Sequence, residues 1–144
     1  MTHIELKKPY KLLPKYAGMR PRDEVIWDQY VENNPDAFTW VMYNVHVGDP
    51  VADEQYRHAM VANGAFEVGQ WCVDVLAFDG TKEYIIEVKP SAGASAIGQV
   101  LSYLKILQHE GRVSMQAVPV ILTDNISPIT ELACKLLGVH ILIP

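Results

Sequence analysis

The stretch VDVLAFDGTKEYIIEVKP, residues 73–90, reads as two β-strands joined by a tight turn. Residues 73–78 and 83–89 are rich in Val, Ile, Phe and Tyr, which favour strands. The Asp-Gly-Thr sequence at 79–81 is a turn signal of the kind found between paired strands. These features predict an antiparallel hairpin.

The length of the turn determines how two acidic residues lie across the hairpin. A two-residue loop at 80–81, or a four-residue loop over 79–82, sets Asp74 opposite Glu87, with Cβ atoms about 5 Å apart. A turn one residue earlier sets Asp74 opposite Ile85 and leaves Glu87 diagonal to it on the same face. Only a loop of three or five residues would put the two acids on opposite faces.

Glu87 and Lys89 also share a face, because side chains alternate along a strand. Two carboxylates this close raise one another's pKa unless a cation lies between them. Mg²⁺ accepts one or two carboxylates together with water and phosphate oxygens, and Mn²⁺ can replace it. Lys89 is then placed to orient or deprotonate an attacking water. The alternative is a solvated hairpin face with an ordinary salt bridge between Lys89 and one acid.

Residues 94–110 predict a helix that packs one side on a sheet, since its apolar residues recur at helical spacing. Gln99 and Tyr103 are four residues apart and therefore neighbours on an adjacent helix face. From that face they can point toward the charged patch of the hairpin, although a polar residue and an aromatic on a helix flank can equally be plain surface residues.

With Asp74, Glu87-x-Lys89 and Gln99-x-x-x-Tyr103 in this order, the chain resembles the PD-(D/E)XK nuclease superfamily, particularly its RecB-like branch. The EVKP string at 87–90 is also similar to TnsA-type transposon endonucleases. Val73 stands where the name-giving proline of the motif would be. The resemblance extends over residues 21–123, but its specific content is these few residues.

The resemblance implies a restriction-endonuclease-like core of a helix, three antiparallel strands, a helix and a further strand. It implies Asp74 and Glu87 as metal ligands and Lys89 as the group that activates water. The backbone carbonyl of Val88 is expected to join the metal ligands. A Glu on the helix before the sheet is also typical of the superfamily, and Glu24 is the candidate, with Glu32 as a weaker choice.

The remaining elements predict one α/β domain with a central mixed sheet of four to five strands flanked by helices. A first helix is expected over 22–33 and a first strand over 38–48. Further on, the sequence predicts a buried strand at 118–124, a helix from an N-cap at Ser127 to a stop at Gly138, and a last strand over 139–143. Residues 51–64 read as either a short helix or a loop over the site.

At 144 residues the chain is long enough for one compact domain, predicted over 21–144, preceded by a basic arm at 1–20. No apolar run is long enough to span a membrane, and the N-terminus has no signal-peptide pattern, so a cytoplasmic protein without a membrane partner is expected.

The net charge of −5 hides an uneven distribution. Residues 1–22 carry six basic residues against Glu5 alone, with Tyr10 and Tyr16 interleaved. Phosphate contacts combined with stacking are typical of nucleic-acid binding. The arm is interpreted as a clamp on nucleic acid, although a solubilising tail or a dimer-swapping segment fits the same pattern. The candidate nucleic-acid-binding residues are Lys7, Lys8, Lys11, Lys15, Arg20 and Arg22.

Taken together, the sequence predicts a Mg²⁺-dependent nuclease, with DNA as the expected substrate. It would act in phage, repair, recombination or mobile-element DNA processing. The weakly basic surface suggests help from a homodimer partner or a larger complex. The alternatives are a non-catalytic module on the same fold that binds nucleic acid or protein, and a structural subunit whose hairpin charges only form salt bridges.

Overall fold

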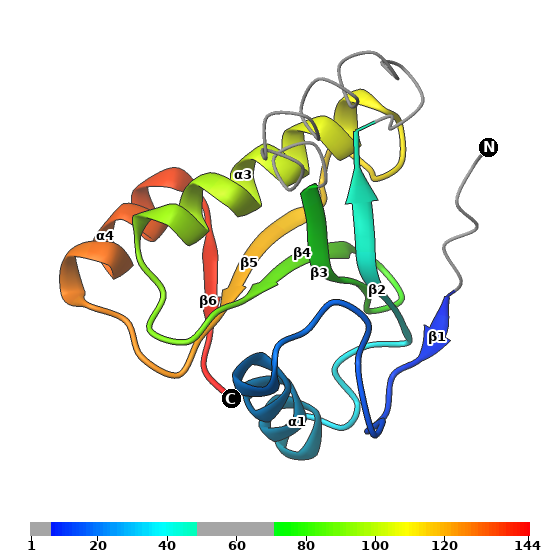
Figure 1. Ribbon diagram of the computed structural model, residues 1–144. Helices are drawn as coiled ribbons and strands as arrows, with labels where there is room; N and C mark the ends of the chain where they lie inside the picture. The colour runs from blue at the N-terminus through cyan, green and yellow to red at the C-terminus, as the bar shows by residue number, and fades with distance from the viewer. Residues whose placement is uncertain (1–6, 49–70) are drawn as a thin grey trace, which may run out of the picture.

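The computed structural model describes residues 7–48 and 71–144, and a central six-stranded sheet dominates this part of the chain (Figure 1). The predicted segment 51–64 lies outside the described residues. The strands are β1 (Lys8–Pro9), β2 (Trp40–Val47), β3 (Trp71–Phe78), β4 (Glu83–Val88), β5 (Val118–Leu122) and β6 (His140–Leu142), and the helices are α1 (Pro21–Asn33), α3 (Ala94–His109) and α4 (Pro128–Leu137).

The strands follow one another across the sheet in chain order, from β1 at one edge to β6 at the other. β1 to β4 pair antiparallel, whereas β4, β5 and β6 are parallel. The parallel connections run through α3 and α4, as parallel strands require. The fold is therefore α/β with a mixed open sheet, as the sequence predicts.

Helices cover both faces of the sheet, with α1 on one and α3 and α4 on the other (Figure 1). On the first face, Trp27 of α1 is fully buried against Val41 and Val75 of the sheet. On the second, Val100 and Leu107 of α3 pack on Ile85. Each face thus has its own apolar core, which leaves the sheet buried on both sides.

The prediction of four to five strands is wrong, because the described residues form six. The additional strand is β1, in which Lys8 faces Val41 and Pro9 faces Trp40. Two residues have no hydrophobic periodicity, and a proline argues against a strand except at a sheet edge. β1 occupies such an edge, and only the pairing with β2 defines it.

The local signals of the hairpin and of α4 are confirmed. Asp79 Oδ1 accepts hydrogen bonds from the N–H groups of Thr81 and Lys82, which closes the turn and sets Phe78 opposite Glu83. Ser127 caps α4 by accepting from the Thr130 N–H at 3.2 Å. α4 ends at Gly138, whose φ of 74° suits a glycine after a helix.

The described part of the expected arm, residues 7–20, packs against the α1 side of the sheet. Tyr16 is buried, and the Tyr10 hydroxyl donates to the Asn34 carbonyl at the end of α1. The Tyr16 ring is consequently unavailable for stacking on a nucleobase.

Among the described residues, no helix combines the length and the apolar character needed to cross a bilayer.

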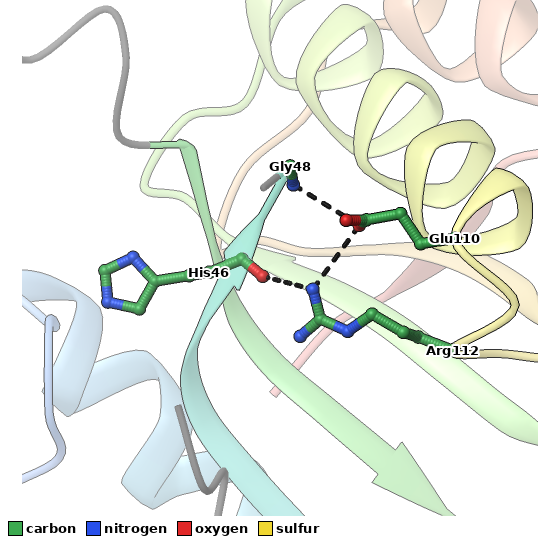
Figure 2. A network of polar contacts seen from close by, with 4 residues as sticks. All are labelled: His46, Gly48, Glu110 and Arg112. Atoms are coloured by element: carbon green, nitrogen blue, oxygen red, sulfur yellow. Dashed lines mark hydrogen bonds and ion pairs between the residues drawn. The ribbon is translucent and has the colours of Figure 1, made fainter. Parts of the chain in front are cut away.

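The end of β2 is fastened to the segment that follows α3 (Figure 2). Arg112 donates to the His46 carbonyl at 2.7 Å and lies 3.4 Å from Glu110 Oε1. Glu110 Oε1 also accepts from the Gly48 N–H at 3.3 Å. These contacts fix the part of β2 that borders the site described next.

Candidate active site

The site begins where β3 and β4 separate. Their pairing ends at Val75 opposite Ile86, after which β3 remains paired only with β2 and β4 only with β5. Asp74 and Glu87 are the first residues beyond that last pair, one on each strand. The two acids therefore lie at the fork between diverging strands, as the predicted register requires.

The side chain of Asp74 accepts a hydrogen bond from a backbone N–H of β4 at the point where β3 and β4 no longer pair. Its Oδ2 accepts from the Val88 N–H at 2.8 Å. This contact satisfies a donor that the separation of the strands would otherwise leave without a partner, and it holds the Asp74 carboxyl beside β4. The side chain of Asp74 thus helps to hold the fork in place.

The face pattern of the strands also changes at this position. Tyr43 and Val75 face each other and pack on the α1 side, whereas Val45 and Val73, the next matched pair, pack on the α3 side. Strict alternation would keep residues two apart on one face. Asn44, which has a φ of 54°, lies between the two pairs and therefore interrupts the alternation next to the acid.

Glu87 is 8 % exposed, and its Oε2 is buried without a hydrogen-bond partner among the described residues. The pKa of Glu87 is raised to about 10, first by burial and then by the neighbouring Asp74 carboxyl. The pKa of Asp74 is also raised, mainly by burial, even though hydrogen bonds to Glu87 and Val88 oppose that shift. Without a cation, the pair therefore retains a proton at neutral pH.

Lys89 is exposed and lines the same cavity as the acids. Its positive charge lowers the pKa of both Asp74 and Glu87, so the ammonium group lies within electrostatic reach of both. The Lys89 N–H donates to the Leu122 carbonyl at 3.0 Å. This backbone contact fixes the point at which the lysine leaves β4.

The loop after Lys89 is held against the segment that follows β5. The Ser91 N–H donates to Asp124 Oδ1 at 2.8 Å, and the Ala92 N–H donates to Thr123 Oγ1 at 3.1 Å. Thr123 is fully buried. Its hydroxyl therefore supports the loop from within the protein rather than facing a ligand.

The N-terminus of α1 forms another wall of the cavity, contributed by Arg20, Arg22 and Asp23. A helix N-terminus attracts anions, and two arginines add positive charge. Asp23 adds a third acid, whose charge raises the pKa of Asp74 and Glu87. Phosphate groups and a cation can both be accommodated by this combination of charges.

Glu24, the acid expected from the resemblance, points elsewhere. Its Oε2 accepts from the Tyr16 N–H at 3.0 Å, and it is absent from the described lining of the cavity. Glu24 thereby fastens the segment before α1 to the helix. Asp23 holds the position nearer to the acid pair, and adjacent residues on a helix point about 100° apart, so this one-residue difference decides which acid faces the cavity.

The cavity around the acid pair, here called the acid cavity, is open and has a volume of about 550 Å³. Gln99 is exposed and lines it from α3. Tyr103 is buried one turn further along α3, and its pKa is raised to about 12 by burial and by the charges of Glu87 and Asp74. α3 thus brings both predicted residues to the site.

A second cavity of about 730 Å³ adjoins the first, with Arg20 and Gln99 in the walls of both. We call it the aromatic cavity, because Trp71 and Tyr103 line it with ring centroids 6.2 Å apart. Cys72 also borders it, and its Sγ lies 3.4 Å from His46 Nδ1. The two cavities together extend from the acid pair along the flank of α3.

The acid pair has the donor chemistry for a divalent cation. A divalent cation would give the unpartnered, buried Oε2 of Glu87 a ligand and would offset the repulsion between the two neighbouring carboxyls. The described residues contain no cluster of three or more His, Cys, Asp or Glu side chains that could hold a metal. Two carboxylates meet the requirement of Mg²⁺, which keeps waters and substrate oxygens as its other ligands.

The other expected nucleic-acid-binding residues lie apart from the described walls of these cavities. Lys7, Lys8, Lys11 and Lys15 are exposed, and the Lys7 ammonium lies 4.6 Å from the ring centroid of Trp40.

Comparison with protein-family models, with curated proteins and with solved structures finds no match to this chain. The function of the site is therefore inferred from the geometry of its residues.

Sequence reasoning missed Asp23, Asn44 and Trp71 as residues of the site. Asp23 and Glu24 are adjacent acids on the expected first helix, and the sequence pattern does not distinguish which of them faces the site. Trp71 and Asn44 belong to strands, where a single aromatic or amide carries no functional signal. Only the pairing of β2 with β3 brings them to the cavities.

Proposed function

We propose that this chain is a divalent-metal-dependent nuclease that hydrolyses phosphodiester bonds, with DNA as the substrate. The observation that carries the proposal is the pair formed by half-buried Asp74 and buried Glu87 at the strand fork, with Lys89 in the same cavity. Resemblance to the PD-(D/E)XK motif points to the same chemistry. The same proposal places the protein in phage, repair, recombination or mobile-element DNA processing.

Asp74 and Glu87 would hold Mg²⁺ or Mn²⁺, and the Val88 backbone is expected to complete the protein ligands. When bound, the cation supplies Lewis-acid chemistry at the scissile phosphate and lowers the pKa of a water. Lys89 would orient that water and offset the negative charge that develops on the phosphate. Gln99 would hold the phosphate backbone or Lys89, and Tyr103 would pack beside them.

Arg20, Arg22 and the N-terminus of α1 would bind the phosphates next to the scissile bond. Guanidinium groups suit this task, because they donate two parallel hydrogen bonds to phosphate oxygens. Glu24 would act indirectly, because its contact with the Tyr16 N–H holds the segment that carries Arg20. The resemblance assigns Glu24 to a second metal or to its water shell, and in this proposal Asp23, which lines the acid cavity, would orient water there without binding the metal directly.

The test is a cleavage assay with Mg²⁺ or Mn²⁺ on duplex, single-stranded and branched DNA. We expect Glu87→Gln and Lys89→Ala each to lower the cleavage rate by about a hundredfold or more. Glu32→Gln is the matched control, since Glu32 is exposed near the far end of α1. Equal rates in all four proteins would exclude the assigned roles.

Calorimetric titration with Mn²⁺ tests the metal site independently of the substrate. Wild-type protein should bind Mn²⁺, and Asp74→Asn should lose that binding because it removes one of the two anionic ligands. Nucleic-acid binding with neither cleavage nor metal binding would instead identify a non-catalytic binding module.

A further inference from the structure

The aromatic cavity has an exposed aromatic face beside the acid pair. Trp71 is 41 % exposed, although it belongs to a strand whose other apolar side chains are largely buried. Tyr103 meets it with the rings inclined by 62°, which supports the indole from one side. The exposed part of the indole therefore gives the cavity an aromatic, apolar surface.

Polar groups surround this surface. Asn44 and Gln99 contribute amides, and Ser95 and Ser102 contribute hydroxyls. Amides and hydroxyls can each donate and accept hydrogen bonds, as the edge of a nucleobase requires. The volume of about 730 Å³ falls within the range of pockets that hold small organic ligands.

The position of the aromatic cavity relates it to the proposed reaction. Arg20 and Gln99 line both cavities, so a ligand in one continues directly into the other. The acid cavity has the charges for a phosphate and a cation, whereas the aromatic cavity, apart from Arg20 at its border with the acid cavity, has an apolar aromatic surface and neutral polar groups. One nucleotide presents these two chemistries next to each other.

We propose that the aromatic cavity binds the base of an unpaired nucleotide adjacent to the scissile phosphate, an inference that rests on the proposed nuclease function. Within a duplex, both faces of a base are stacked and its pairing edge is occupied. Only an unpaired or extruded base exposes a face to Trp71 and an edge to the amides. The substrate is therefore single-stranded DNA, or DNA with unpaired nucleotides at the cleavage position.

The first experiment measures binding by fluorescence anisotropy in EDTA, without a divalent cation. The probes are a single-stranded thymidine oligonucleotide, an abasic strand of equal length and a duplex of the same length. Wild-type protein should bind the thymidine strand about tenfold more tightly than the abasic strand, which keeps the phosphates but lacks the bases. Equal affinity for these two strands overturns the inference, and this comparison requires no variant.

Substitution of Trp71 assigns the effect to the cavity. Trp71→Ala should lose the preference for bases over abasic sites, whereas Trp71→Phe, which keeps a stacking ring, should retain most of it. Ile129→Ala is the control, because Ile129 is also exposed and apolar but lies on α4. A full preference for bases in Trp71→Ala overturns the inference.

A cleavage assay separates failure of this inference from failure of the proposed function. Glu87→Gln should abolish cleavage and keep the preference for bases in the binding assay, whereas Trp71→Ala should lose the preference for unpaired over duplex substrate in both assays. Cleavage by wild-type protein without any base preference overturns only this inference. A base preference without cleavage or metal binding overturns the proposed function and leaves the cavity as a binding site.

Discussion

Glu87 is the residue on which the site depends most directly. A carboxyl that is 8 % exposed and beside another carboxyl is costly to ionise, and the rise of its pKa to about 10 expresses that cost. Such an arrangement lowers the stability of the metal-free folded protein, as buried functional groups commonly do. A divalent cation would reverse this effect by favouring the ionised form.

The raised pKa predicts that the metal-free protein loses stability as the pH rises. Between the unfolded pKa of Glu, about 4.3, and the higher folded pKa, the native state keeps a proton that the unfolded chain releases. The free energy of unfolding in EDTA should therefore fall by roughly 1–3 kcal/mol between about pH 5.5 and pH 8. Urea unfolding at both pH values measures it.

The same experiment on Glu87→Gln should give a weaker pH dependence and a higher stability at pH 8 than wild type. Glu32→Gln, which changes an exposed acid, should behave like wild type. Addition of Mn²⁺ at pH 8 should stabilise wild type and leave Glu87→Gln nearly unchanged. A Glu87→Gln curve that parallels wild type across this pH range would contradict the assignment of the proton to this site.

At the scale of elements, the contact between the segment before α1 and β2 shapes the mouth of the site. Gly18 has a φ of 79°, and a Cβ built on it would lie 2.4 Å from Asn44 Oδ1. Asn44 itself has a positive φ where the strand changes face. Gly18 and Asn44 therefore fit together only while position 18 lacks a side chain, two residues before Arg20, which lines both cavities.

Gly18→Ala should destabilise the protein by about 2–4 kcal/mol, because it combines an unfavourable φ with a clash against Asn44. Gly111→Ala is the matched control, since Gly111 has a φ of 69° but open space around its Cβ. It should cost only about 1 kcal/mol. Thermal and urea unfolding measure both variants, and equal losses would show that the clash with Asn44 has no effect.

Across the whole molecule, positive charge is gathered at one place although the net charge is negative. The net charge is −5, yet Arg20, Arg22 and the N-terminus of α1 face the acid cavity. Binding should therefore depend on a local group of positive charges rather than on a broad basic surface. The exposed lysines of residues 7–15 lie outside the described walls of both cavities.

Arg22→Ala should weaken binding of single-stranded DNA in EDTA and reduce the slope of log affinity against log salt by about 0.7, the value of one lost phosphate contact. Lys11→Ala tests the N-terminal segment in the same assay, because Lys11 is also exposed. A larger change for Lys11 than for Arg22 would place the nucleic acid on the N-terminal segment instead of the acid cavity.

Strong local signals predict the hairpin and α4 from the sequence, whereas the hairpin register stays open between alternatives until the pairing of Phe78 with Glu83 selects one. The turn at 79–82 closes through Asp79 and pairs Phe78 with Glu83, and this register continues to Val75 opposite Ile86, just before the two acids. The caps of α4 are likewise local, since Ser127 and Gly138 act on groups within a few residues of themselves.

The surroundings of the acid pair depend on contacts between residues that are far apart in the chain. β1 exists only as a partner of β2, and Trp71 and Asn44 meet the site only because β2 pairs with β3. The choice of Asp23 over Glu24 depends on how α1 is rotated against the sheet, which the packing of Trp27 and Ile26 sets. Contacts between residues far apart in the chain produce no periodic pattern in the sequence. The residues that line the cavities could therefore not be predicted from the sequence.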